Sequence, residues 1–212
     1  MGTTAEQIIK AYPRSRAFAD KLVSVSEEMG IDPAWLANVI QSESSFNTKA
    51  VNPNNGAAGL IQFTKTTARG MGTSTSAILN MSGSQQLDLV KRYLQPYLPL
   101  RSQLDVVLAV FYPAALGKPN NFDIADHYAA EVMGRTRGSD AYWRSYNYLK
   151  DINNGIHLKG DYTKKFQSRW RLVPPPGPIQ ILGNVALFSI SALASAGVIF
   201  YINQRRDRLG VI

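Results

Sequence analysis

Glu43 is the side chain whose type and position are best suited to chemistry. It follows Val39 by four residues and Ile40 by three, so on a helix it shares their apolar face. A carboxyl group on a core-facing stripe is partly removed from water, which raises its pKa. A carboxyl group with a raised pKa still holds a proton near neutral pH, as a general acid must. The sequence therefore predicts that Glu43 is a general acid.

The helix that carries Glu43 has clear signals at its start. Asp32 suits the N-cap position and Pro33 suits the first helical position, and the helix is expected to end near Asn47. No segment alternates polar and apolar residues for long, so strands are expected to be few or absent and the fold all-α. Apolar spacing and capping residues predict further helices at 14–29, 84–97, 102–111, 123–133, 140–152 and 161–170.

A loop and then a tight turn that leads into a short helix are expected after the Glu43 helix. The loop reads VNPNNGAAG and is rich in residues that break regular structure, and GLIQF comes directly after it. The segments ESSF and GAAGLIQF, in this order and at this spacing, resemble the lytic transglycosylases of the goose-lysozyme-like superfamily (SLT type). The resemblance is close over about residues 32–67, and it implies a lysozyme-like helical domain.

The resemblance also implies a reaction on peptidoglycan. In this family one carboxyl group protonates the leaving oxygen of the β-1,4 bond after N-acetylmuramic acid. The same group then takes the proton of the sugar's C6 hydroxyl, which closes a 1,6-anhydro ring without water. No acidic residue lies between Glu43 and Asp88, which agrees with a single catalytic carboxyl group.

Substrate-binding residues follow from matching the family motifs. Ser44 and Gln62 are expected to hydrogen-bond acetamido or peptide groups, and Gly59 to let the backbone approach the sugar. The family's Ala-Tyr-Asn-Ala-Gly segment corresponds to residues 109–114, where Tyr112 stands for the tyrosine and the asparagine is missing. The family also has a tyrosine near the catalytic glutamate that comes late in the domain sequence. It corresponds to Tyr146 or Tyr148 here, and we take Tyr148 as the candidate.

Composition excludes several other kinds of site. The chain has 212 residues, no cysteine and two histidines far apart in the sequence, so thiolate metal sites and a cysteine nucleophile are excluded, and no metal or cofactor is expected. The net charge of +8 favours a polyanionic partner such as nucleic acid, anionic lipid or the acidic bacterial cell wall, and charge alone does not choose among these. No nucleic-acid binding is expected, because the aromatic and basic clusters fit the ends of amphipathic helices.

The composition changes after residue 172. Residues 1–172 are expected to form the catalytic domain, residues 173–178 (VPPPGP) a stiff linker and residues 204–212 a basic tail. Residues 179–202 contain no charge, so a single transmembrane helix is expected at 179–203. This organisation predicts one C-terminal membrane anchor, with a lipid membrane as a partner.

The expected function is a lytic transglycosylase that degrades peptidoglycan. The absence of a signal peptide ahead of the domain, together with the expected anchor, suggests an enzyme of a membrane-containing bacteriophage. It would sit in the virion's internal membrane beside membrane or capsid proteins, and act in the host periplasm or cell envelope. The alternatives are a hydrolytic muramidase or cell-wall endopeptidase on the same fold, or a virion membrane protein without enzymatic activity.

Overall fold

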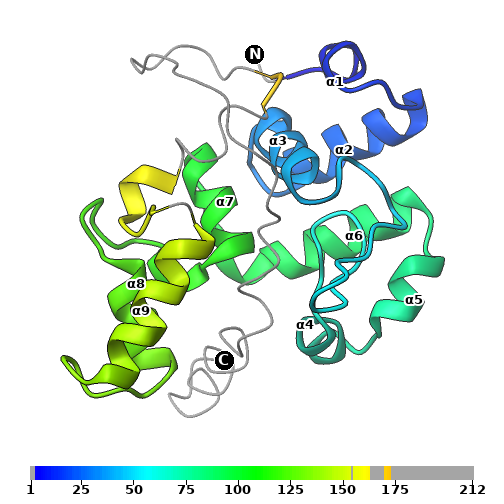
Figure 1. Ribbon diagram of the computed structural model, residues 1–212. Coiled ribbons are helices and arrows are strands. Elements are labelled where there is room, and N and C mark those ends of the chain that lie inside the picture. Colours follow the sequence, from blue (N-terminus) through cyan, green and yellow to red (C-terminus); the bar gives the residue numbers. More distant parts are fainter. Residues whose placement is uncertain (1–2, 154, 163–169, 173–212) are drawn as a thin grey trace.

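The computed structural model describes residues 3–153, 155–162 and 170–172, and the regular elements of this part of the chain are helices (Figure 1). Its α-helices are α1 (Ala5–Ala11), α2 (Arg16–Glu28), α3 (Pro33–Ser44), α4 (Lys65–Gly70), α5 (Thr75–Asn80), α6 (Gly83–Leu94), α7 (Gln103–Phe111), α8 (Ile124–His127) and α9 (Asp140–Ile152). Three short 3₁₀ turns, η1 (Gln95–Tyr97), η2 (Pro113–Ala115) and η4 (Lys159–Asp161), and one π-helical turn, η3 (Tyr128–Val132), complete it.

Each α-helix in the described part begins with a polar N-cap side chain that accepts a backbone N–H, which is why short helices of modest propensity form here. The expected caps Asp32 and Ser102 are confirmed. The helix expected to begin at Ser84 instead starts after Ser82, because Ser82 and Gln85 exchange hydrogen bonds in a capping box. The caps are Thr4, Ser15, Asp32, Thr64, Ser74, Ser82, Ser102, Asp123 and Ser139.

The helices gather into two parts, as Figure 1 shows. In the first part α2 packs against α1, α3 and α6, and in the second α8, η3 and α9 pack against one another. Helix α7 joins the two parts, because it contacts α3 on one side and continues into η2 on the other. The core consists of side chains such as Leu22, Leu36, Ile40, Leu87, Phe111, Tyr112, Ile124, Leu149 and Tyr162, all of them buried.

The last described residues return to the beginning of the chain. The backbone N–H of Arg171 donates to the Tyr12 hydroxyl (2.7 Å), and the Asn38 amide donates to the carbonyl of Leu172 (2.9 Å). The Tyr12 hydroxyl in turn donates to Asn38 (2.7 Å), so α3 is tied to both ends of the described chain. Most of the helix expected at 161–170 lies outside the described residues.

The expected fold is corrected in one respect. Among the described residues, no helix is long and apolar enough to cross a membrane. The longest helices there, α2 and α9, have 13 residues each, and such a helix is about 20 Å long against about 30 Å of hydrocarbon core. The expected transmembrane helix at 179–203 lies outside the described residues. The fold is therefore an all-helical domain, consistent with a lysozyme-like fold, and the added membrane-spanning element was wrong.

Candidate active site

Glu43 lies in the last turn of α3 and is buried, with 7% of its surface exposed. The helix around it is buried on most sides, since α3 packs against α2 and α7. Its start is fixed by Asp32, whose carboxylate accepts the N–H of Ala34 (2.8 Å), with Pro33 at the first helical position. The predicted placement of a carboxyl group on the core-facing side of this helix is confirmed.

The chain leaves α3 through two residues in left-handed conformation. Ser45 has φ 51° and Phe46 has φ 61°, and neither is glycine, so each costs about 1 kcal/mol. Packing holds them there: the Phe46 ring lies 5.1 Å from that of Tyr12 and 6.0 Å from that of Phe18. The Arg14 guanidinium stacks over the same ring at 4.9 Å and donates to the carbonyl of Ser45 (2.6 Å). The turn that carries Glu43 is thereby fixed in one geometry.

The GLIQF segment forms the tight turn predicted from its sequence. Ala58 and Phe63 exchange backbone hydrogen bonds of 3.0 and 2.9 Å, and the N–H of Gln62 donates to the carbonyl of Gly59 (3.2 Å). Gly59 (φ 79°) and Gln62 (φ 54°) both adopt left-handed backbone geometry inside this loop. We call residues 58–63 the GLIQF turn.

Two polar side chains join the GLIQF turn to its neighbours through the peptide groups of Leu60. The Ser44 hydroxyl, next to Glu43, donates to the carbonyl of Leu60 (2.9 Å). The N–H of Leu60 donates to the side-chain oxygen of Gln86 on α6 (2.9 Å). The Gln86 amide nitrogen donates to the carbonyls of Thr48 and Ile78, both at 2.9 Å. Helices α3 and α6 therefore hold the turn from two sides.

Gln86 was not predicted from the sequence. It is completely buried, and its amide group satisfies three backbone groups from separate segments. The signal that could have found it is a polar residue directly before Leu87 at the start of the apolar stripe of α6. A buried amide needs partners in the protein, and such partners are usually backbone groups of a loop.

Three predicted substrate-binding residues lie together at this turn. Ser44 and Gly59 flank Leu60, and the side chain of Gln62 folds back to donate to the carbonyls of Gly59 (3.0 Å) and Ala50 (3.4 Å). In the described structure these groups shape the turn beside Glu43. Their contact with substrate stays a prediction.

A buried tyrosine that the sequence did not indicate packs against the GLIQF turn. Tyr93 on α6 is buried, its hydroxyl donates to the carbonyl of Ala109 (3.0 Å), and its ring packs edge-on against Phe63 (5.9 Å). Burial raises its pKa well above the ordinary value, and interaction with Tyr97 and the negative charge of Glu43 raise it further. Tyr93 also lines a small cavity with Gln62 and Phe63. Helical spacing alone does not separate a core tyrosine from one beside a site.

This geometry agrees with a comparison to known families. Residues 23–88 match the family model described as the transglycosylase SLT domain. This part of the chain is similar to the SLT domain. The matched region contains Glu43, the GLIQF turn and Gln86, and it covers about a third of the chain. It indicates a lytic transglycosylase-type function on peptidoglycan. Searches of curated proteins and of solved structures returned no match.

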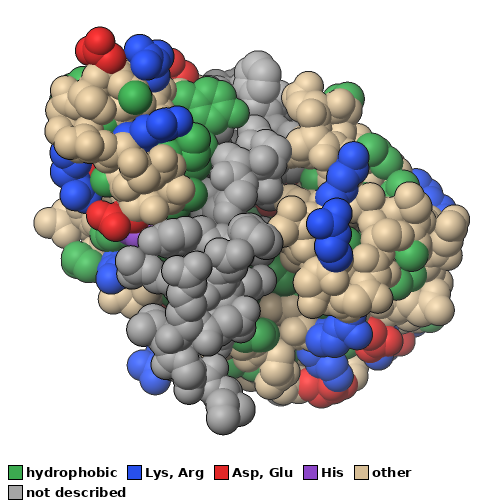
Figure 2. Space-filling model, turned by 90° about the horizontal axis from the view of Figure 1, so that it is seen from below, with side chains coloured by type: hydrophobic (Ala, Val, Ile, Leu, Met, Phe, Trp, Pro, Cys, Tyr) green, Lys and Arg blue, Asp and Glu red, His purple; other side chains and the backbone are tan. Residues whose placement is uncertain are grey.

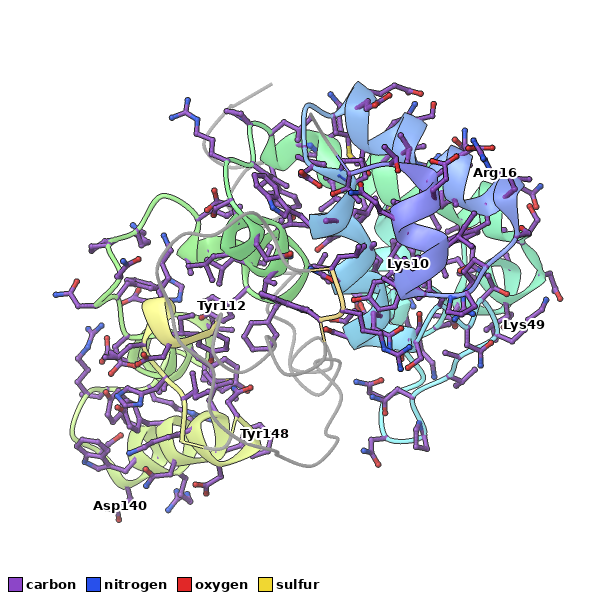
Figure 3. All side chains as sticks on the ribbon, turned by 90° about the horizontal axis from the view of Figure 1, so that it is seen from above. Lys10, Arg16, Lys49, Tyr112, Asp140 and Tyr148 are labelled. Atoms are coloured by element: carbon purple, nitrogen blue, oxygen red, sulfur yellow. The ribbon has the colours of Figure 1, made fainter. Side chains whose placement is uncertain are left out.

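The other two predicted substrate-binding residues lie outside the SLT match, in the second part of the molecule. Tyr112 is fully buried at the end of α7, and its hydroxyl lies 2.7 Å from Nδ1 of His127. Tyr148 lies on α9, with 47% of its surface exposed. Figure 3 shows Tyr148 and Asp140 toward opposite ends of α9, with Tyr112 among the side chains between α9 and α7. The described contacts do not bring either tyrosine to Glu43, and their role in binding stays a prediction.

The four aspartates from Asp88 to Asp126 that could have supplied a second catalytic carboxylate have structural partners. Asp88 pairs with Lys21 (2.6 Å), and Asp105 accepts the backbone N–H of Arg101 (2.9 Å). Asp123 caps α8, and Asp126 pairs with Arg137 (2.9 Å). These contacts agree with the interpretation of the aspartates as caps and surface groups. Among the described residues, no group of three or more acidic, histidine or cysteine side chains could hold a metal ion.

The burial of His127 predicts a pH dependence of stability. Burial lowers the pKa of His127; the positive charges of Lys118 and Arg137 lower it further, while Glu131 and Asp126 oppose the shift. The folded protein therefore binds the proton less readily than the unfolded chain, in which the pKa of histidine is about 6.5. The contribution of His127 to stability is fully present above a pH of about 6.5 and is lost as the pH falls through the lower pKa of His127 in the folded protein. We expect the free energy of unfolding in urea to fall between about pH 7.5 and about pH 5, and less so in His127→Gln. Equal slopes in both proteins would contradict this.

Proposed function

We propose that the protein cleaves the β-1,4 bond between N-acetylmuramic acid and N-acetylglucosamine as a lytic transglycosylase, with Glu43 as its single catalytic carboxyl group. The carboxyl group donates a proton to the glycosidic oxygen while the bond from that oxygen to C1 breaks. The C6 hydroxyl oxygen then bonds to C1, and the ionised Glu43 takes its proton. The product is a 1,6-anhydro sugar, and no water is consumed.

The observation that carries this proposal is the position of Glu43. It is buried at the end of α3, one residue from Ser44, which joins the helix to the GLIQF turn within the SLT match. Burial disfavours the charged form of a carboxyl group, which favours a protonated acid before the first step. A buried position also limits the access of water, which favours attack by the sugar's own hydroxyl.

Mass spectrometry of digested peptidoglycan tests the proposal. We expect muropeptides that end in an anhydro sugar and are lighter by one water than those of a hydrolytic muramidase. Incubation in water enriched in ¹⁸O gives a second readout, because the transglycosylase reaction incorporates no solvent oxygen at C1. Reducing-end products that carry ¹⁸O would reassign the protein as a muramidase, and cleaved peptides would reassign it as an endopeptidase.

The proposed substrate places the site of action in the bacterial cell envelope. The expected association with a virion membrane had the transmembrane helix as its premise, and it is not part of this proposal.

A further inference from the structure

A pocket outside the SLT match lies between the start of α7 and η4. Its described walls come from η1, the start of α7, residues 116–118 and η4, and we call it the η4 pocket. Its volume is about 310 Å³. Liquid water occupies about 30 Å³ per molecule, so the pocket has room for a small organic molecule. The proposed reaction at Glu43 makes no use of this pocket.

The charged side chains that line the η4 pocket are mostly cationic. Arg101, Lys118 and Lys159 are positive, and Asp105 is the negative side chain among the described lining residues. Asp105 accepts the backbone N–H of Arg101 (2.9 Å). Within the described part of the chain, none of the three cations forms an ion pair. The described lining therefore carries an excess of two positive charges.

Lys159 is the unusual member of this set. It is 7% exposed, and burial of an ammonium group costs free energy unless other groups solvate the charge. Its ammonium group donates to the backbone carbonyl of Lys118. An ammonium group has three donors, so two remain for an acceptor in the pocket that Lys159 lines. A bound anion would supply both the acceptors and the opposite charge.

A phosphate monoester matches these features. It carries a charge of about −1.5 to −2 at pH 7 and three strong acceptor oxygens, so it balances the excess charge of the lining. Guanidinium groups donate two parallel hydrogen bonds to phosphate, and lysine binds phosphate as a point charge. A carboxylate carries a single charge and would leave part of the excess unbalanced. Figure 2 shows Lys and Arg side chains on both parts of the face drawn there, in line with a net charge of +8, so the surroundings also attract an anion.

We propose that the η4 pocket binds a phosphate monoester through Lys159, Arg101 and Lys118. The burial of Lys159 favours a soluble ligand that enters the pocket over a headgroup that is held in a lipid membrane. This binding is separate from cleavage by Glu43, so the proposal does not depend on the proposed function.

The test titrates sn-glycerol 3-phosphate into the full chain and follows the backbone ¹H–¹⁵N spectrum. We expect the amide signals of residues 116–118 and of Lys159 to shift, because these residues line the pocket. Binding should weaken as salt is added, and also below about pH 6, where the monoester takes up its second proton. Glycerate, which has a carboxylate in place of the phosphate ester, should bind about tenfold more weakly.

Two variants connect the binding to the proposed side chains. Lys159→Met keeps the apolar stem and removes the ammonium group, whereas Arg101→Gln changes an exposed side chain and serves as the test if the buried variant does not fold. We expect each to raise the dissociation constant about tenfold, since hydrogen bonds to charged groups contribute at this level. Lys10→Gln removes an exposed positive charge from α1 and is the matched control, whose dissociation constant should equal that of the unaltered chain.

Vesicles distinguish a lipid source of the phosphate monoester from a soluble one. The full chain and Lys159→Met are mixed with phosphatidylcholine vesicles that contain or lack phosphatidic acid, and we expect both chains to bind them alike. Binding that depends on phosphatidic acid and is lost in Lys159→Met would reassign the pocket to a lipid headgroup and overturn the soluble ligand. An unchanged dissociation constant for glycerol phosphate in Arg101→Gln, or equal binding of glycerate, overturns the phosphate assignment.

Discussion

Glu43→Gln is expected to remove peptidoglycan cleavage while leaving the fold intact. Glutamine has nearly the same shape as glutamate but cannot donate an acidic proton to the glycosidic oxygen or accept one from the C6 hydroxyl. General acid and base catalysis each contribute about 10²- to 10⁴-fold, so we expect kcat to fall by about a thousandfold or more. The release of soluble anhydro-muropeptides, followed by mass spectrometry, measures this loss.

The control for this variant is Glu27→Gln, which removes one negative charge from an exposed position on α2. It should retain the activity of the unaltered protein, because Glu27 is exposed to solvent and lies outside the GLIQF turn. Both variants should unfold at the same urea concentration as the unaltered protein, within error. Wall cleavage that survives Glu43→Gln with the same anhydro product would show that another group is the catalytic acid.

Gly59→Ala is expected to cost about 2–4 kcal/mol of folding stability and to lower activity in proportion to the displacement of the GLIQF turn. Two effects add. The backbone of Gly59 has φ 79°, which is strained for alanine. An added Cβ would also lie 2.6 Å from Oε1 of Gln86 and 2.9 Å from Cγ2 of Ile78, so the amide that holds Leu60 must move. Urea unfolding followed by circular dichroism measures the sum.

Gly72→Ala separates these two effects. Gly72 has φ 70°, close to that of Gly59, but an added Cβ meets nothing within 4 Å. The control should therefore show the backbone cost alone, about 1 kcal/mol. Equal losses in the two variants would mean that Gln86 yields without cost, and that it does not hold the turn as we describe.

Local signals made the Glu43 helix and the GLIQF turn predictable. Asp32 and Pro33 mark the start of α3, and the spacing of Val39, Ile40 and Glu43 places the carboxyl group on the buried face. Such signals act within one or two helical turns. The two motifs ESSF and GAAGLIQF also indicated that this helix and the turn belong to one site, because the two motifs occur in the same order and at a similar spacing in the SLT family.

The contacts that complete the site could not be predicted in the same way. Leu60 and Gln86 are 26 residues apart, and the ring of Tyr93 meets Phe63 across a similar separation. Nothing in the local pattern of α6 tells which of its buried side chains faces the turn. The burial of Tyr112 against His127 is likewise set by tertiary packing, and the contact of Tyr112 with sugar stays a prediction. Only the packing of distant helices decides these questions.

The groups that hold the GLIQF turn have a consequence for kinetics. The described bonds from Ser44 and Gln86 to this turn are made by a hydroxyl, an amide and backbone groups, none of which changes protonation between mildly acidic and mildly basic solution. The geometry of the turn is therefore independent of acidity over this range. Under the proposed mechanism, a pH–rate profile would then report the titration of the catalytic carboxyl group, free of any titration within these anchoring contacts.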